Sequence, residues 1–529
     1  MNRVVRYDGP VFAEPSKQYY VEVNGKSVFV HPVRVSSKLV NQLFRGKVRD
    51  LSESEISSVV HFDFEGIAHI RVVCAWEIFK TKLTPDSKAI AVSRAERNKA
   101  DEVSFDITQP GQYALEINGT HCPLHIFADP IEQNKPRIDD PDVYYVAAEE
   151  KPLYCGVYTG GAAANICKEI QAACKAGKTI YFGPGIHQID ALYLEDNSKV
   201  YLDGGAIVYG SLIGNGKQNL KIFGRGILDG SRYSRDVPDS PLINSLYFAN
   251  CRNVEVDGIF VRDSAIYNVA TACCEDIHYN NIKIISWRPN SDGADFHNTK
   301  NVHIENSFIR CFDDCICVKG QKEYHGTACN HMPSENFLIE KTILWNDWGR
   351  ALEIGAETSG DYIQNITFRD CDILHFAFIA CDVQACGDAP VSHIVFENIR
   401  VGDPISNDGD PRLMEVFIRS MIWMKDEPLG SVRNVTFRDI QYTGMSIVPC
   451  RFIGSSLGND IQQVDLENIM VNGRQLTRED NPLAPILYNE FACAIRLDGR
   501  PIDRNRAIYE SEEDTCKNYQ VGNGAFLRA

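Results

Sequence analysis

The sequence predicts an all-β protein in which an N-terminal β-sandwich precedes a parallel β-helix, a solenoid of stacked strand coils. Three observations predict this fold. Apolar and polar residues alternate in short stretches over residues 1–135, a strand pattern repeats between residues 253 and 471, and one stretch has the spacing of an amphipathic helix. We expect the sandwich over residues 1–135, a linker over 136–150 and the β-helix over 151–529.

The N-terminal region has the pattern of antiparallel strands. Stretches such as YYVEVNGKSVFVHPVRV (19–35) and FDFEGIAHIRVV (62–73) are bounded by Gly, Asp or Asn, and Asn118-Gly119 is a dipeptide that favours a tight hairpin turn. Residues 128–145 then combine three prolines with five acidic residues, a composition that resists regular structure. We therefore expect the domain boundary there.

The single helix is expected over residues 163–176. Ile166, Ile170, Ala173 and Cys174 have amphipathic spacing, and Gly177 ends the pattern. At this position the helix would cap the open end of the solenoid, where an unpaired coil would otherwise invite aggregation.

The repeated strand units begin at residues 253, 276, 301, 336, 365, 393, 434 and 463. Their strands lack the leucine spacing of leucine-rich repeats and the 3.6-residue period of helical repeats, so a parallel β-helix remains. Its coils place equivalent strands about 4.8 Å apart and leave one outer face as a groove. The insertions 321–335 and 404–432 interrupt the repeat, and we expect them to form loops that wall this groove.

The chain carries 54 Lys and Arg residues against 71 Asp and Glu residues, a formal net charge of −17. This charge excludes a protein that binds nucleic acid through bulk electrostatics.

No apolar run is long enough to predict a membrane span. The N-terminus lacks the pattern of a secretory signal, so we expect a cytoplasmic protein. The edges of the N-terminal strands leave a homo-oligomer open.

Many of the 18 cysteines stand singly in apolar runs, and no CxxC spacing occurs. We interpret most of them as reduced, packed thiols, and we expect neither a metal nor another cofactor.

One stretch of the repeat, residues 287–320, concentrates groups that could do chemistry. Asp292 and Asp313 are 21 residues apart, about one coil, which predicts neighbouring rungs of one sheet. Splayed side chains there could reach the separation of about 6.5–9.5 Å that inverting glycosidases use. With Asp295 and Asp314 added, the crowded carboxylates cannot all ionise cheaply, so at least one should hold a proton. Each aspartate taken alone could equally be a turn or strand-end residue. Asp313 and Asp314 are adjacent, so both can face a groove only if the strand bends or ends there.

The motif N-S-D-G-A-D (290–295) followed by F-D-D-C-I-C-V-K-G (312–320) resembles the two aspartate blocks of the polygalacturonases, glycoside hydrolase family 28. Residues 192–211 and 224–231 are similar to that family's first coils, and the resemblance covers about residues 145–475. It implies a right-handed, pectate-lyase-like β-helix and an inverting hydrolase without a cofactor. Asp313 would be the general acid, and Asp292 with Asp314 would activate the water.

The sequence departs from that family in ways that bear on the substrate. Arg350 stands where a G-H-G block would place its His, and no Arg-x-Lys follows residue 320 to bind a uronate carboxylate. The dextranase and isopullulanase family, glycoside hydrolase family 49, is similar in its aspartates and its N-terminal sandwich. These features favour a neutral α-glucan substrate, with a pectin hydrolase of the polygalacturonase type as the alternative.

Six further residues form the candidate substrate-binding set: Asp295, His297, Lys319, Trp348, Arg350 and Glu353. Trp348 could stack on a sugar face, as could Trp287 and Trp345, but all three could instead fill the core. Arg350 and Glu353 could bind hydroxyls, or pair with each other. His297 could contact substrate or be a structural residue, and Lys319 could neutralise the aspartates.

Other functional classes stay open from the sequence alone. A β-helix lyase or glycosyl transferase could use the same groove, although a lyase would need a basic residue as its catalytic base. A non-catalytic carbohydrate-binding protein would keep the tryptophans but would not need the aspartates. Since crowded carboxylates cost stability, they favour catalysis.

Overall fold

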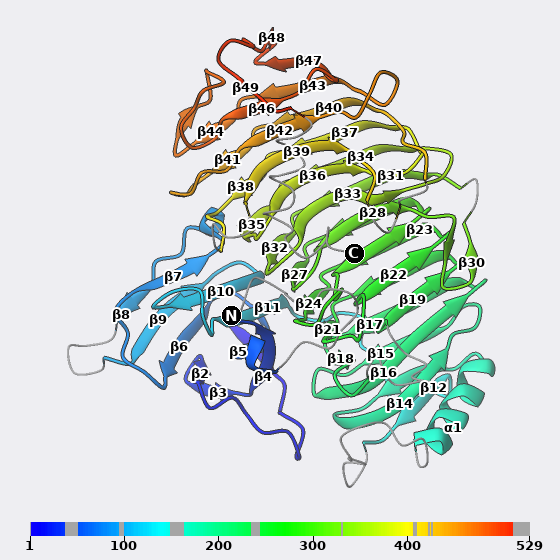
Figure 1. Ribbon diagram of the computed structural model, residues 1–529. Helices are drawn as coiled ribbons and strands as arrows, with labels where there is room; N and C mark the ends of the chain where they lie inside the picture. Colours follow the sequence, from blue (N-terminus) through cyan, green and yellow to red (C-terminus); the bar gives the residue numbers. More distant parts are fainter. Residues whose placement is uncertain are drawn as a thin grey trace.

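The computed structural model describes residues 2–37, 51–94, 100–148, 163–233, 244–329, 332–405, 410–421, 424 and 427–511. Two sheets form the sandwich, drawn in blue and cyan beside the long solenoid in Figure 1. The first contains β1 (Arg3–Arg6), β5 (Ser54–Glu65), β11 (Leu124–Pro130), β10 (Gly111–Ile117) and β7 (Thr81–Thr84), with β4 (Val30–Ser36) also paired to β5. The second contains β3 (Lys26–Val28), β2 (Tyr19–Val23), β6 (Ala68–Cys74), β9 (Glu102–Ile107) and β8 (Ser93–Arg94).

The solenoid has three strands in most coils, which stack into three columns of parallel strands. The first column contains β12 (Val143–Val146), β13 (Thr179–Phe182), β15 (Lys199–Leu202), β17 (Gln218–Gly224), β20 (Arg252–Asp257), β23 (Glu275–Asn280), β26 (Lys300–Glu305), β31 (Ser334–Glu340), β34 (Ile363–Arg369), β37 (Val391–Glu397), β40 (Val432–Arg438), β43 (Ile461–Glu467) and β47 (Ala492–Leu497), and it ends at the antiparallel β48 (Arg500–Pro501). The strand β12 therefore begins the solenoid inside the predicted linker, because the sequence VYYV favours a strand.

Two long strands, β14 (Gly185–Tyr193) and β16 (Ala206–Asn215), start the other two columns. The second column contains β18 (Ile227–Asp229), β21 (Phe260–Arg262), β24 (Lys283–Ile285), β27 (Phe308–Cys311), β32 (Ile343–Asn346), β35 (Asp372–His375), β38 (Arg400–Val401), β41 (Gln441–Tyr442) and β44 (Met470–Val471), followed by the antiparallel β45 (Arg474–Gln475). The third column contains β19 (Leu246–Ala249), β22 (Val269–Ala272), β25 (Ala294–His297), β28 (Ile316–Gly320), β33 (Arg350–Thr358), β36 (Ile379–Ala385), β39 (Arg412–Ile418), β42 (Cys450–Ile453), β46 (Ile486–Tyr488) and β49 (Ile508–Tyr509). This architecture confirms the predicted right-handed parallel β-helix with an N-terminal β-sandwich.

The interior of the solenoid is a continuous apolar core built from the inward side chains of all three columns. Equivalent residues stack from coil to coil: the rings of Phe368, Phe396 and Phe437 lie parallel, with centroids 4.8 and 4.9 Å apart. The helix α1 (Ala163–Lys175) contacts β12, β13 and β14 at the N-terminal end of the solenoid (Figure 1). Of the fifteen cysteines whose side chains the structure describes, thirteen are buried and all are free thiols, as predicted for packed cysteines. None of the helices in the described ranges combines the length and the apolarity that crossing a bilayer requires.

The sandwich packs on the outer face of the second column. An apolar cluster joins Val33, Val59 and Phe127 of the sandwich to solenoid residues that run from Ile207 in β16 to Leu374 in β35. Buried ion pairs flank this cluster, among them Lys283 with Asp129 and Arg225 with Asp63.

Each strand of the first column from β20 to β43 is followed by one corner residue with a positive φ, after which the chain turns into the second column. These corner residues are Gly258, Asn281, Asn306, Lys341, Asp370, Asn398, Asp439 and Asn468, with φ between 49° and 81°. Gly, Asn and Asp tolerate this left-handed conformation best, so the repeated Asn and Asp of the sequence mark the corners of the coils.

Candidate active site

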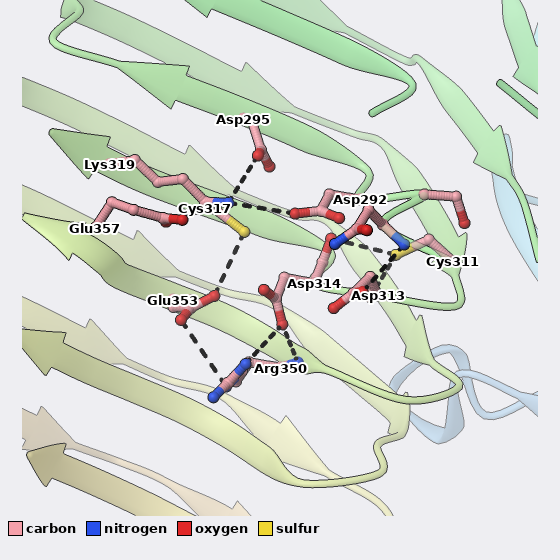
Figure 2. A network of polar contacts seen from close by, with 12 residues as sticks. Asp292, Asp295, Cys311, Asp313, Asp314, Cys317, Lys319, Arg350, Glu353 and Glu357 are labelled. Carbon is pink, nitrogen blue, oxygen red and sulfur yellow. Dashed lines mark hydrogen bonds and ion pairs between the residues drawn. The ribbon is translucent and has the colours of Figure 1, made fainter. Parts of the chain in front are cut away.

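The predicted aspartates lie at one corner of two neighbouring coils, where the second column leads into the third (Figure 2). Asp292 lies in the loop before β25, and Asp313 and Asp314 lie in the turn between β27 and β28. The backbone N–H of Gly293 donates to the carbonyl of Asp314 at 2.8 Å, which fixes the register of the two loops. The sequence predicts Asp292 and Asp313 on neighbouring coils, and this is where they lie. The structure corrects one detail: both occupy turns rather than strands of a sheet.

The turn between β27 and β28 explains how adjacent aspartates share one site. The strand β27 ends at Cys311 and β28 begins at Ile316, so the alternation of a strand does not apply to the residues between them. The side chain of Asn346 and the thiol of Cys311 hold this turn by donating to the carbonyl of Asp313, at 2.6 and 3.0 Å. Asp313 and Asp314 are 6% and 7% exposed, whereas Asp292 and Asp295 are 2% and 0% exposed.

Asp313 has the electrostatics of a proton donor. Burial, followed by the neighbouring charge of Asp314, raises the pKa of Asp313 to about 7. One of its oxygens accepts the backbone N–H of Asn290 at 3.2 Å. Asp292 lies deeper, and burial together with Asp295 raises its pKa well above the usual range. Both shifts favour the protonated form of these carboxyls, which is the direction that the crowding of carboxylates predicts.

Asp314 has a different environment because Arg350 contacts it with both its backbone and its side chain. The backbone N–H of Arg350 donates to Asp314 Oδ1 at 2.7 Å, and the guanidinium Nη1 lies 3.6 Å from the same oxygen. One residue thus supplies Asp314 with a hydrogen-bond donor and a nearby cation. Gly349 makes the approach possible, since a Cβ at this position would lie 2.1 Å from Asp314 Oδ1.

Lys319 holds the buried side of the cluster together. Its Nζ lies 2.9 Å from Asp295, 3.3 Å from Asp292 and 3.7 Å from Glu357, and all four residues are largely buried. Burial raises the pKa of Asp295 to about 6, while the charge of Lys319 opposes this shift. These ion pairs fit the alternative in which Lys319 neutralises the clustered aspartates, and its role in substrate binding stays a prediction. Glu357 was missed, because nothing in the sequence places its coil position beside Lys319.

His297 and Trp348 are both buried among aromatic rings. His297 is 0% exposed and stacks on Tyr324, with ring centroids 4.0 Å apart. Neither of its ring nitrogens has a hydrogen-bond partner among the described residues, and burial lowers its pKa well below the usual value. Trp348 is 4% exposed and lies between Phe312 and Phe378. This packing favours the core role of Trp348 over stacking on a sugar.

Trp345 and Trp287, the other two tryptophans considered for sugar stacking, are buried as well. Trp345 is fully buried against the sandwich, where its ring packs on His125 and His375. Trp287 is 6% exposed.

Of the predicted insertions, residues 323–328 form the hairpin of β29 (Glu323–Tyr324) and β30 (Thr327–Ala328), which brings Tyr324 onto His297. Residues 330–331, 406–409, 422–423 and 425–426 of the insertions lie outside the described residues.

A row of ionisable residues, most of them acidic, extends from the cluster along the third column. The residues in register are Asp295, Cys317, Glu353, Asp382, Glu415 and Arg451. Burial raises the pKa of Glu353 and Asp382 well above the usual values, and Arg350 lies 3.8 and 3.5 Å from them. Sequence reasoning found Glu353 but not Asp382, Glu415 or Arg451. Their equivalent positions in successive coils follow from the pairing of the third-column strands.

Two groups of side chains in the described residues could hold a metal ion. Asp292, Asp314 and Cys317 each place a ligand atom within 4.8 Å of the others, as do His278, His303 and Glu305 on the first column. In the first group Lys319 already supplies a positive charge 3.3 Å from Asp292, so the carboxylates there do not need a cation for neutralisation.

Comparisons with known proteins find a family match and several relatives. The sequence profile of "Glycosyl hydrolases family 28" matches residues 167–481. "Polygalacturonase-2" of Solanum lycopersicum is 23% identical over 272 residues, which cover 48% of this chain and 56% of that protein. "Polygalacturonase" of Gossypium barbadense is 24% identical over 277 residues, covering 49% and 63%. The chain thus spans little more than half the length of these curated relatives.

Two solved structures share the fold. Dex49A from Penicillium minioluteum has a TM-score of 0.54 at 13% identity, over 95% of this chain and 92% of that one. A hyperthermoactive exopolygalacturonase from Thermotoga maritima has a TM-score of 0.50 at 16% identity, over 65% of this chain and 94% of that one. At these identities the likeness concerns the fold alone.

Proposed function

We propose that this chain, which belongs to the glycosyl hydrolases of family 28, hydrolyses glycosidic bonds in a saccharide that contains galacturonic acid. The observation that carries the proposal is a pair of adjacent aspartates that have different environments in one turn. Burial and the charge of Asp314 raise the pKa of Asp313 to about 7, while Asp314 accepts the backbone N–H of Arg350 and lies 3.6 Å from its guanidinium. A proton donor and a charged carboxylate at one corner are what acid-catalysed glycoside cleavage requires.

In the proposed mechanism, Asp313 donates its proton to the glycosidic oxygen as the bond to the anomeric carbon breaks. A water molecule attacks that carbon from the opposite face, and Asp314 accepts the proton that the water releases. Asp292 orients the water, because Lys319 holds its carboxyl within the cluster. One direct displacement by water inverts the anomeric configuration.

The relatives support a pectin-type substrate, which the sequence offered only as the alternative. Both plant relatives described above are named polygalacturonases. A neutral α-glucan is the second candidate, and one observation favours it. Lys319 and Arg350 are both ion-paired with carboxylates of the protein, which makes them poor partners for a uronate.

The experiment compares wild type with Asp313→Asn on polygalacturonate, galacturonic acid oligomers and α-glucans, following released sugar and its anomeric configuration by NMR. We expect inverted galacturonic acid products, and a loss of about 10²–10⁴-fold in Asp313→Asn. Asp276→Asn, which removes an aspartate from the first column, is the matched control and should keep full activity.

The other outcomes separate the alternatives. Activity confined to α-glucans would favour the second candidate, and an unsaturated product would indicate a lyase. A product without oxygen from labelled water would indicate a glycosyl transferase. Binding without turnover would indicate a carbohydrate-binding protein, and full activity in Asp313→Asn would refute the proposed acid.

A further inference from the structure

A cleft of about 930 Å³ lies between the sandwich and the solenoid. The sandwich lines it with the 3₁₀ turn η2 (Asp86–Lys88) and with residues 109–112 and 129–134, and the solenoid lines it with corners between the first and second columns. No residue of the aspartate turns lines this cleft. Within one coil, Asn281 precedes β24 and lines the cleft, whereas Asp292 follows β24. The sandwich packs on β24 and so lies between the two positions. The cleft is therefore separate from the candidate active site.

The floor of the cleft is a network of amide side chains. The side-chain amide of Asn306 donates to Asn280 Oδ1 at 3.0 Å, and the side-chain amide of Asn280 donates to Asp257 Oδ1 at 2.8 Å. From the sandwich, Gln112 donates to Asn281 at 2.7 Å. Amides carry both donors and acceptors, so such a surface suits a ligand rich in hydroxyl groups.

Lys88 adds a positive charge from the sandwich. Its Nζ lies 4.1 Å from the centre of the Tyr113 ring and contacts the Gln112 carbonyl at 3.4 Å. Within the described part of the chain it forms no ion pair. Other cations of the cleft are compensated: Arg225 pairs with Asp63, and Arg400 pairs with Asp372.

Lys341 adds a second positive charge from the solenoid, at a position that does not suit a lysine. It is a corner residue with φ of 49°, where the other seven corners carry Gly, Asn or Asp. A left-handed conformation is unfavourable for an ordinary L-residue, because it brings Cβ too close to the following carbonyl oxygen. Lys341 also forms no ion pair with any described residue. Local strain of this kind is typical of a position kept for binding rather than for folding.

We propose that this cleft is a second saccharide-binding site, which takes a uronate-containing oligosaccharide with Lys88 and Lys341 pairing its carboxylates and the amide floor binding its hydroxyls. The site follows from its own lining, and only the choice of galacturonic acid as the test sugar rests on the proposed function. Neither lysine forms an ion pair with a described residue, so each can pair a carboxylate of the ligand, in a cleft that Glu132, Asp257 and Asp370 also line.

The test is calorimetric titration of the full chain carrying Asp313→Asn, which prevents turnover. The ligands are the galacturonic acid trimer and maltotriose as a neutral trimer. With the acidic trimer we expect two binding events, one of which weakens as salt is added. Adding Lys88→Met and Lys341→Asn should weaken that event about tenfold or more, because charge-assisted contacts are lost. The matched pair Lys26→Met and Lys199→Met removes the same charge outside the cleft and should keep both events.

A second measurement separates binding from folding. Lys341→Asn alone places at this corner the residue type that four other corners carry, so it should raise the thermal unfolding midpoint while it weakens the second event. A single binding event that is unchanged by the cleft substitutions would overturn the second site, as would equal binding of maltotriose there. If the wild type fails to cleave galacturonan but the lysine-dependent event persists, the proposed function fails and the second site stands.

Discussion

Gly349 offers a way to move one proposed catalytic carboxylate without removing it. In Gly349→Ala the new Cβ would lie 2.1 Å from Asp314 Oδ1, 2.8 Å from the Asp314 nitrogen and 2.9 Å from the Asp313 carbonyl carbon. Since two of these three atoms belong to the backbone, rotation of the Asp314 side chain cannot relieve the contact. Ordinary contacts are about 3.5 Å, so the turn must shift by about 1 Å. A misplacement of 1 Å costs about 10²-fold in rate.

The assay measures kcat and KM for hydrolysis of a galacturonic acid oligomer, with the thermal unfolding midpoint as a check on the fold. Gly205→Ala is the control, because its Cβ would come no closer than 3.1 Å to its neighbours. The loss should be smaller in an Asp314→Asn background, where only the displacement of Asp313 with the turn still affects the rate. An unchanged kcat in Gly349→Ala, or a full 10²-fold loss on top of Asp314→Asn, would refute the reasoning.

Three further predictions concern the pH response and the packing of the site. Because Asp313 must be protonated to act, kcat/KM should fall as pH rises through about 7, and a basic limb far from this value in a pH–rate profile would contradict its role. Lys319→Met leaves Asp292 and Asp295 buried without a cation and should destabilise the fold by about 3–5 kcal/mol. Since the pKa of both carboxyls is raised by burial, they bind protons on folding, and the loss should be larger at pH 8 than at pH 5 in urea unfolding. Trp348→Ala should cost about 3–5 kcal/mol of stability by leaving a cavity, and a KM that rises in the folded variant would instead restore the sugar-stacking role.

Much of the fold could be predicted because the repeated strand units can be recognised in the amino-acid sequence. The alternation of strands such as NVHIENSFI indicates the inward face, and the Asn or Asp found at most corners indicates the left-handed turn. The spacing of Asp292 and Asp313 likewise predicts neighbouring coils. The length of the turn that holds Asp313 and Asp314 could not be predicted, because the break depends on where β27 stops pairing.

Other features of the site depend on contacts between distant segments. Lys319 meets Glu357 across a 38-residue gap in sequence, and Trp348 meets Phe378 across one of 30. No local pattern encodes either pair. The cleft depends on how the sandwich packs against the solenoid, and Lys341 looks ordinary until its backbone conformation is known.

The apolar cluster between the sandwich and the second column affects how the solenoid can open. A stack of coils touches only its nearest neighbours, so it can fray one coil at a time from either end. The sandwich contacts the stack continuously from β16 to β35, the span that contains both aspartate turns. Any coil in this span that unfolds must also detach from the sandwich, which converts local fraying into a cooperative event. The sandwich thus stabilises this part of the solenoid against coil-by-coil unfolding. The aspartate turns lie within the stabilised span.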